Sequence, residues 1–160
     1  MHTIIQKYKG THNFHNYSKG VKAGDKSSYR YILDMKAELL DKNEMEKILG
    51  KTLENEYLKI TLLGQSFIYH QIRKMVGMVV NIFQDQVDES IIDTSYNNEK
   101  LKVWLAPSEG LLLNRINFDA YNRKVGIPEK IELEEKEAEE LEAFKKRVIY
   151  KEVFGAEEED

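Results

Sequence analysis

The sequence predicts an α+β fold, a mixed α/β arrangement in which helices pack on one face of an antiparallel sheet. Segment 29–39 alternates apolar and polar residues, which is the period of a strand with one buried face. Segment 66–83 places apolar residues at the three- and four-residue spacing of a helix. The 160 residues are 41% hydrophobic and 10% aromatic, which is enough for a packed domain and argues against disorder.

Three strands are predicted, at residues 29–39, 56–63 and 110–118. The alternation in the first puts Tyr29, Tyr31, Leu33, Met35, Ala37 and Leu39 on one face, and Arg30, Ile32, Asp34, Lys36 and Glu38 on the other. Gly64 ends the second strand, and a turn at Gly110 begins the third. So few strands make an incomplete sheet with open edges, which indicates that a complementary half is missing.

Helices are predicted at residues 41–49, 66–83 and 88–96, and from Glu129 onward. Ser66 carries a hydroxyl that can cap the second of these helices. The acidic helix near the C-terminus has a sparse apolar stripe, made of Leu133, Leu141, Phe144 and Val148.

Charge is spread unevenly along the chain, whose formal net charge is −4. Residues 1–128 hold 18 basic and 15 acidic side chains, whereas residues 129–160 hold 6 basic and 13 acidic ones. We therefore predict a boundary at residue 128, with an acidic helical extension after it.

The glycine-broken loop at residues 10–26 lies in the most basic part of the chain. The first thirty residues contain one acidic side chain and six basic ones: Lys7, Lys9, Lys19, Lys22, Lys26 and Arg30. A basic stretch that also carries aromatic rings suits a polyanion such as nucleic acid, although a solvated loop explains the same composition. On charge alone, Lys19, Lys22 and Lys26 are candidate phosphate contacts.

Several classes of site are excluded by residue content. The chain has no cysteine, so it has no disulfide and no thiolate metal site, and a reducing compartment is expected. No apolar run reaches membrane-spanning length, so no membrane partner is predicted. His12 and His15 lie three residues apart without an evident third ligand, so we predict no metal site.

The polar loop segment that contains His12, Asn13 and Phe14 is a candidate RNA contact. Its imidazole and amide groups can hydrogen-bond to RNA, and its phenyl ring can stack on a base. In the alternative reading, Phe14 fills the core while the polar groups cap nearby backbone.

Arg73 lies at the border of the apolar face of helix 66–83, next to a stripe that contains Gly77. A guanidinium cannot shed its charge, so a buried one needs an anionic partner, and no such partner is evident in the sequence. The alternatives are an ion pair with a nearby strand and an arginine that extends to solvent. His70 and Lys74 are expected to be surface groups.

Three segments together resemble a known family: YKGTHNFHNYS at 8–18, GQSFIYHQIRKMVGMVV at 64–80 and APSEGLLLNRINFDAYN at 106–122. They are similar to the C-terminal part of the catalytic domain of TruA-type tRNA pseudouridine synthases, particularly the eukaryotic pseudouridine synthase 1 branch. The resemblance covers roughly residues 4–125, so the fold it implies is a half-domain of the pseudouridine synthase fold.

The resemblance implies an RNA-modifying enzyme that isomerises uridine to pseudouridine in tRNA, with other RNAs as further substrates, and that needs no cofactor. The family flips the target nucleotide out of its stack and uses an essential aspartate in a G-R-T-D-x-G-V segment. No Thr–Asp pair occurs in this sequence. The chain is therefore expected to be a fragment that is inactive alone and that works with the missing N-terminal half of the domain and with tRNA.

Individual roles also follow from the resemblance. Arg73 matches the arginine that pairs with the catalytic aspartate, and Leu111 matches an apolar position that packs near the target base. His12, Asn13 and Phe14 match a segment near the RNA-binding cleft. From the residues alone, Leu111 is better explained as a core residue.

Two other functional classes fit the same residues. One is a non-catalytic RNA-binding module, and the other is a protein-interaction domain that uses the acidic helix. The resemblance implies residence in the nucleus, with the mitochondrion and the cytoplasm as alternatives.

Overall fold

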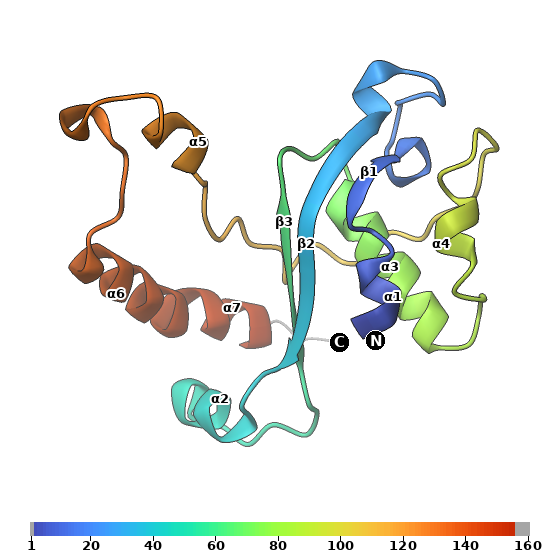
Figure 1. Cartoon of the computed structure of the whole chain (residues 1–160). Coiled ribbons are helices and arrows are strands. Elements are labelled where there is room, and N and C mark those ends of the chain that lie inside the picture. Colours follow the sequence, from blue (N-terminus) through green and yellow to red (C-terminus); the bar gives the residue numbers. More distant parts are fainter. Residues whose placement is uncertain (1, 156–160) are drawn as a thin grey trace. The chain divides into compact units, whose positions relative to one another are not determined.

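The computed structural model describes residues 2–155, and its contacts divide these residues into two compact units (Figure 1). The first unit comprises residues 2–40 and Glu56–Ser108, and the second comprises Asp41–Asn55 and the residues from Glu109 onward. The boundary predicted at residue 128 stays a prediction. Within residues 2–155, no helix is both long and apolar enough to cross a membrane.

The first unit is built on a three-stranded antiparallel sheet in the order β1-β2-β3. Its strands are β1 (Gly10–Asn13), β2 (Tyr29–Leu39) and β3 (Leu58–Gly64). The predicted α+β class and antiparallel sheet are confirmed, and β2 has the predicted bounds. Residues 10–13 were predicted to be loop, and this was wrong because pairing with β2 makes these four residues a strand.

A β-bulge changes which residues of β2 face the core. The register against β3 shifts between Ile32 and Asp34, so one extra residue enters the strand there. Ile32 and Met35 lie three residues apart, and both are 0% exposed, whereas Tyr31 and Leu33 are exposed. Strict alternation put Ile32 on the polar face, and this was wrong because the inserted residue resets the alternation.

Helices cover one side of this sheet (Figure 1). They are α1 (His2–Gln6), α3 (Gln71–Phe83) and α4 (Ile91–Thr94), with short 3-10 turns η1 (His15–Tyr17) and η2 (Lys26–Ser28). The core that they form with β2 contains Ile5, Tyr8, Phe14, Tyr17, Ile32, Met35, Met75, Met78, Val79, Ile82, Ile92 and Val103. The helix predicted at 88–96 is present but shorter, as α4.

The beginning of α3 differs from the prediction. Ser66 was expected to cap it, but α3 begins at Gln71, and the residue before it, His70, has a left-handed backbone with φ of 69°. The buried Gln71 side chain accepts a hydrogen bond from the Ile68 N–H over 2.9 Å. This bond satisfies an amide of the turn that precedes the helix, and α3 ends at Phe83 as predicted.

The second unit is helical. It contains α2 (Lys42–Leu49), α5 (Asp119–Asn122), η3 (Ile127–Glu129), α6 (Glu135–Phe144), the π-helix η4 (Lys145–Ile149) and α7 (Tyr150–Gly155). Asp41 caps α2, and Gly50 ends it in a left-handed conformation. The helices predicted at 41–49 and in the acidic C-terminal segment are confirmed, the latter within residues 135–155 because residues 156–160 lie outside the described part.

The strand predicted at residues 110–118 is not formed in the described structure. Leu111, Leu113 and Ile116 are exposed, so the alternating pattern has neither a sheet partner nor a core beneath it. Asn114 is held by the buried Lys145, whose Nζ donates to Asn114 Oδ1 over 2.6 Å and also pairs with Glu142. Alternation alone therefore did not suffice, because a strand also needs a neighbour for its backbone hydrogen bonds.

Candidate functional site

Arg73 lies in the first turn of α3 and exchanges two hydrogen bonds with Ala106. Its Nε donates to the Ala106 carbonyl over 2.7 Å, and the Ala106 N–H donates to the Arg73 carbonyl over 3.1 Å. These bonds fix the half-buried guanidinium against the segment that follows Val103. Because Nε is used, the two terminal nitrogens remain for a carboxylate.

Gly77 allows the backbone around Trp104 to lie directly on α3. A Cβ at position 77 would lie 2.9 Å from the Trp104 carbonyl carbon, closer than real Cβ atoms approach. The glycine is buried one helical turn beyond Arg73. Sequence reasoning placed Gly77 where another backbone approaches, and the structure identifies that backbone as residues 104–106.

No acidic side chain pairs with Arg73 among residues 2–155. The same part of the chain contains no group of three or more histidine, cysteine or acidic residues that could hold a metal ion. The pairing with a catalytic aspartate stays a prediction, since this chain lacks that segment.

The segment His12, Asn13 and Phe14 is largely built into the core. Phe14 is 0% exposed and packs against the ring of Tyr17, while Asn13 is 4% exposed and its Oδ1 accepts from the backbone N–H of His15. The half-buried His12 ring stacks on Tyr96 with 4.1 Å between ring centroids. This placement favours the packing reading of Phe14, and RNA contact by these residues stays a prediction.

Behind this segment lies a buried chain of hydroxyl groups. The Tyr17 hydroxyl lies 2.8 Å from Ser95 Oγ and 3.4 Å from the Tyr8 hydroxyl, and its single proton can be donated to only one of them. The Tyr8 hydroxyl donates to the Met75 carbonyl of α3. Burial raises the pKa of Tyr17 to about 12, and burial also raises the pKa of Tyr8 and of Tyr96. These phenols therefore stay neutral. Their contacts join η1, the residues just before β1 and the residues just after α4 to the helix that carries Arg73.

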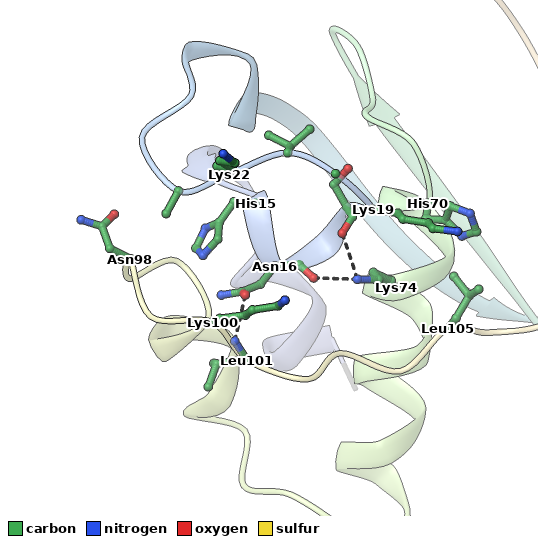
Figure 2. Close-up of a pocket in the computed structure, with 14 residues that line it drawn as sticks. His15, Asn16, Lys19, Lys22, His70, Lys74, Asn98, Lys100, Leu101 and Leu105 are labelled. Atoms are coloured by element: carbon green, nitrogen blue, oxygen red, sulfur yellow. Dashed lines mark hydrogen bonds between the residues drawn. The ribbon is translucent and has the colours of Figure 1, made fainter.

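Beside the N-terminal end of α3 lies an open hollow of about 730 Å³ with basic walls (Figure 2). Of the lysines predicted to contact phosphate, Lys19 and Lys22 line this hollow, whereas Lys26 does not. Lys74 and Lys100 also line it, and sequence reasoning missed them because they come from α3 and from the loop after α4. We refer to this feature as the basic hollow.

His70 also lines the basic hollow and lies three residues before Arg73 in the sequence. Desolvation, together with the positive charges of Arg73, Lys19 and Lys74, lowers the pKa of its imidazole. His70 and Lys74 were expected to be surface groups, and both are partly exposed. Leu111, in contrast, belongs to the second unit and is 51% exposed.

Comparison with known proteins adds relatives that share most of this chain. Residues 4–119 match the family described as tRNA pseudouridine synthase. The chain is 38% identical over 160 residues to human "Pseudouridylate synthase 1 homolog", an alignment that includes 98% of this chain and 35% of the human protein. It is 31% identical to "tRNA pseudouridine synthase 1" of Candida albicans, across 98% of this chain and 24% of that protein.

A third relative, "tRNA pseudouridine(27/28) synthase" of Saccharomyces cerevisiae, is 34% identical across 76% of this chain and 30% of its own length. The chain thus spans between about a quarter and about a third of these curated relatives. The matched segment contains Arg73, Gly77, Ala106 and the basic hollow. On the strength of a match that includes well over half of its residues, this chain belongs to the tRNA pseudouridine synthase family.

Proposed function

We propose that this chain supplies the arginine-bearing part of an enzyme that isomerises uridine to pseudouridine in tRNA. The observation that carries the proposal is Arg73, whose guanidinium is anchored through Nε and has no acidic partner among the described residues. Support for the reaction comes from the family match and from the names of the relatives.

In this proposal, Arg73 acts on a carboxylate that another segment of polypeptide provides. The two terminal nitrogens of its guanidinium face a carboxylate in the bidentate geometry that arginine favours. A guanidinium that is hydrogen-bonded to a carboxyl group lowers the pKa of that group and keeps it ionised and correctly oriented. Arg73 thus prepares the catalytic aspartate, and Ala106 and Gly77 hold Arg73 in position.

The reaction itself rearranges the atoms of one nucleotide. The bond between N1 of uracil and C1′ of the ribose breaks, and a bond between C5 of uracil and C1′ forms. C5 loses its proton and N1 gains one, so substrate and product have the same composition. Nothing is oxidised or reduced, which is why we propose that no cofactor takes part.

The chain alone is proposed to be inactive, because it contains no Thr–Asp pair. The proposed partners are therefore the rest of the catalytic domain and tRNA, with other RNAs as further substrates. We propose the nucleus as the compartment, with the mitochondrion and the cytoplasm as alternatives. A second candidate function is RNA binding without catalysis, which is favoured by the basic hollow that this chain forms from its own residues.

A chimera tests the proposed function. In it, this chain replaces the matching segment of human Pseudouridylate synthase 1 homolog, and pseudouridine formation in tRNA is measured. We expect turnover by the chimera and none by the 160-residue chain. Arg73→Ala in the chimera should cost about 3 kcal/mol through a broken ion pair, which is about a hundredfold in rate.

Arg115→Ala provides the matched control, because Arg115 is exposed and no hydrogen bond or ion pair joins it to another described residue. It should leave turnover within about twofold, as is usual for a surface substitution. Turnover by the chain alone would contradict the need for an added aspartate, and an Arg73→Ala chimera as fast as its parent would reduce Arg73 to a structural residue.

A further inference from the structure

The basic hollow collects cations from three separate stretches of the first unit. Its walls come from residues 15–23, from the beginning of α3 and from residues 98–105. Its lining includes four lysines and two histidines, which are Lys19, Lys22, Lys74, Lys100, His15 and His70. No aspartate or glutamate is among its lining residues. Figure 2 draws His15 between Lys22 and Lys100.

The hydrogen bonds that join the three walls use no carboxylate, although within the first wall the Lys22 N–H donates to the Asp25 carboxylate over 2.9 Å. Asn16, which is 4% exposed, donates through Nδ2 to the carbonyls of Ser95 and Glu99 and accepts from the Leu101 N–H. Lys74 Nζ donates to the carbonyls of Asn16 and Ser18 over 3.0 and 3.1 Å (Figure 2). The loop after β1, the loop after α4 and α3 are therefore tied to one another by hydrogen bonds.

Lys74 leaves positive charge uncompensated inside the basic hollow. Its ammonium is only partly exposed, and both of its hydrogen-bond partners in the described structure are neutral carbonyls. Burial, with a smaller effect from Lys100, lowers its pKa. One of its three N–H donors remains unused by these bonds. An anion that entered the hollow would accept from that donor and offset the cost of a desolvated cation.

Two of the residues that line the basic hollow lie close in sequence to Arg73 or to Ala106, which holds it. His70 precedes the first turn of α3, and Leu105 precedes Ala106, the residue that anchors the guanidinium. A volume of about 730 Å³ lies within the range of small-molecule sites and exceeds what one phosphate group needs. The cavity can therefore hold a phosphate with part of its nucleotide, close to the place where the target nucleotide would meet Arg73.

We propose that the basic hollow binds phosphate groups of the RNA strand that flanks the target uridine, through Lys22, Lys74 and Lys100. This assignment rests on the proposed function for its RNA ligand, while the anion site itself is a property of this chain. Lysine suits the task because its compact ammonium binds phosphate as a point charge in many orientations. The flanking phosphates would hold the strand in register while the target nucleotide is flipped.

Two double variants of the 160-residue chain test the assignment. Lys22→Ala with Lys100→Ala removes two cations from the hollow. Lys9→Ala with Lys102→Ala removes the same charge from two exposed positions of the first unit that do not line it. Lys74 is left intact because it also holds the walls together. Binding of a fluorescent twelve-residue oligoadenylate is measured by anisotropy at several salt concentrations.

The hollow variant should bind the oligoadenylate about tenfold more weakly and should lose about 1.4 from the slope of log K against log salt, or about 0.7 for each lost phosphate contact. The control pair should change affinity by less than about twofold, since distant exposed charges are screened. Equal weakening by both pairs would mean that the oligoadenylate is attracted by the general positive charge of the surface. Unchanged binding by the hollow variant would mean that the oligoadenylate does not bind in the hollow. Either result overturns the assignment.

Inorganic phosphate distinguishes a site for RNA phosphates from one for the free ion. Both ligands should shift the NMR signals of the His15 and His70 imidazoles, and oligoadenylate should do so at a lower concentration. If only inorganic phosphate shifts them, the RNA assignment is wrong. Arg73→Ala should leave oligoadenylate affinity within about twofold, as expected for a single charge outside the lining, so failure of catalysis and failure of the hollow give different results.

Discussion

Arg73 and Ala106 form a reciprocal pair, in which the arginine side chain donates to the alanine carbonyl and the alanine N–H donates back to the arginine carbonyl. A side chain that is held only by its tip retains several rotamers. Here, the acceptor of the Nε bond is itself fixed by a second bond to the backbone of the same arginine. The direction of the guanidinium therefore depends on how closely residues 104–106 lie on α3, and Gly77 determines that separation.

Gly77→Ala should lower both stability and turnover. The new Cβ would press on the Trp104 carbonyl, so either α3 or the segment must shift. Overpacking of this kind costs about 1–3 kcal/mol, which thermal unfolding of the chain would register. In the chimera, turnover should fall as well, because Ala106 moves with the segment. Gly110→Ala is the control, since nothing lies within 4 Å of a Cβ there; an unchanged melting temperature for Gly77→Ala would contradict the close packing.

Arg73→Lys should fail to restore the turnover that Arg73→Ala removes. A lysine ammonium has a single nitrogen and cannot both bond to the Ala106 carbonyl in the place of Nε and bind a carboxylate through two further nitrogens. Pseudouridine formation by the chimera should remain at least about tenfold below that of the parent, equivalent to more than about 1.4 kcal/mol. Full activity of the lysine variant would show that only the charge matters.

The bulge in β2 can be tested with two neighbouring substitutions. Ile32→Ala should destabilise the chain by about 2–5 kcal/mol, as for other large-to-small changes at a fully buried site. Leu33→Ala should cost less than about 1 kcal/mol, because that side chain is 38% exposed. Urea unfolding measures both. The opposite order of effects would mean that β2 alternates strictly and has no bulge.

The His70 imidazole should titrate below the ordinary range of histidine. Desolvation comes first among the causes, followed by the positive charges of Arg73, Lys19 and Lys74. Because the unfolded chain then binds more protons, this group makes stability rise with pH between its folded pKa and its unfolded value. NMR titration should find the pKa higher in Arg73→Ala and higher again with oligoadenylate bound. If neither Arg73→Ala nor bound oligoadenylate changes this pKa, the charges of Arg73 and of the RNA do not act on His70.

Tyr17→Phe should destabilise the chain by about 1 kcal/mol through the lost hydrogen bond to Ser95. Ser95 Oγ keeps its donation to the Ile92 carbonyl, and Tyr8 keeps its own to Met75, so no partner is left wholly unpaired. Tyr29→Phe is the matched control, because Tyr29 is 51% exposed. Spectrophotometric titration should also lose one phenol that ionises near pH 12. Equal stability of the two variants would argue against the buried hydroxyl chain.

Local pattern predicted the parts of the fold that are determined locally. The bounds of β2 and the end of α3 follow from periodicity, and α2 corresponds to the short helix expected at residues 41–49. The bulge beside Leu33 could not be predicted this way, because an inserted residue leaves the alternation of residue types unchanged. The strand predicted at residues 110–118 is not formed for a different reason. Its residues alternate as in a strand, but a strand also needs a neighbouring strand for its backbone hydrogen bonds.

Some residues of the candidate site could also be predicted from the sequence, and others could not. Arg73 was predicted because a permanent charge at the edge of an apolar helix stands out in any sequence. Lys74 and Lys100 did not stand out, because the sequence does not distinguish a lysine that faces solvent from a lysine that lines a pocket. A signal was available only for Lys74, which directly follows Arg73 near the beginning of the helix.

The tie between Lys145 and Asn114 has a practical consequence for anyone who shortens this chain. Trimming the acidic end before residue 145 would remove the ammonium that Asn114 and Glu142 share. It would also take away Phe154, a buried residue of the second unit, whose carbonyl accepts a hydrogen bond from Lys51. The leucine-rich stretch before Asn114 would then lose an anchor that its own residues do not supply. A truncation designed for crystallisation should therefore retain everything through Gly155.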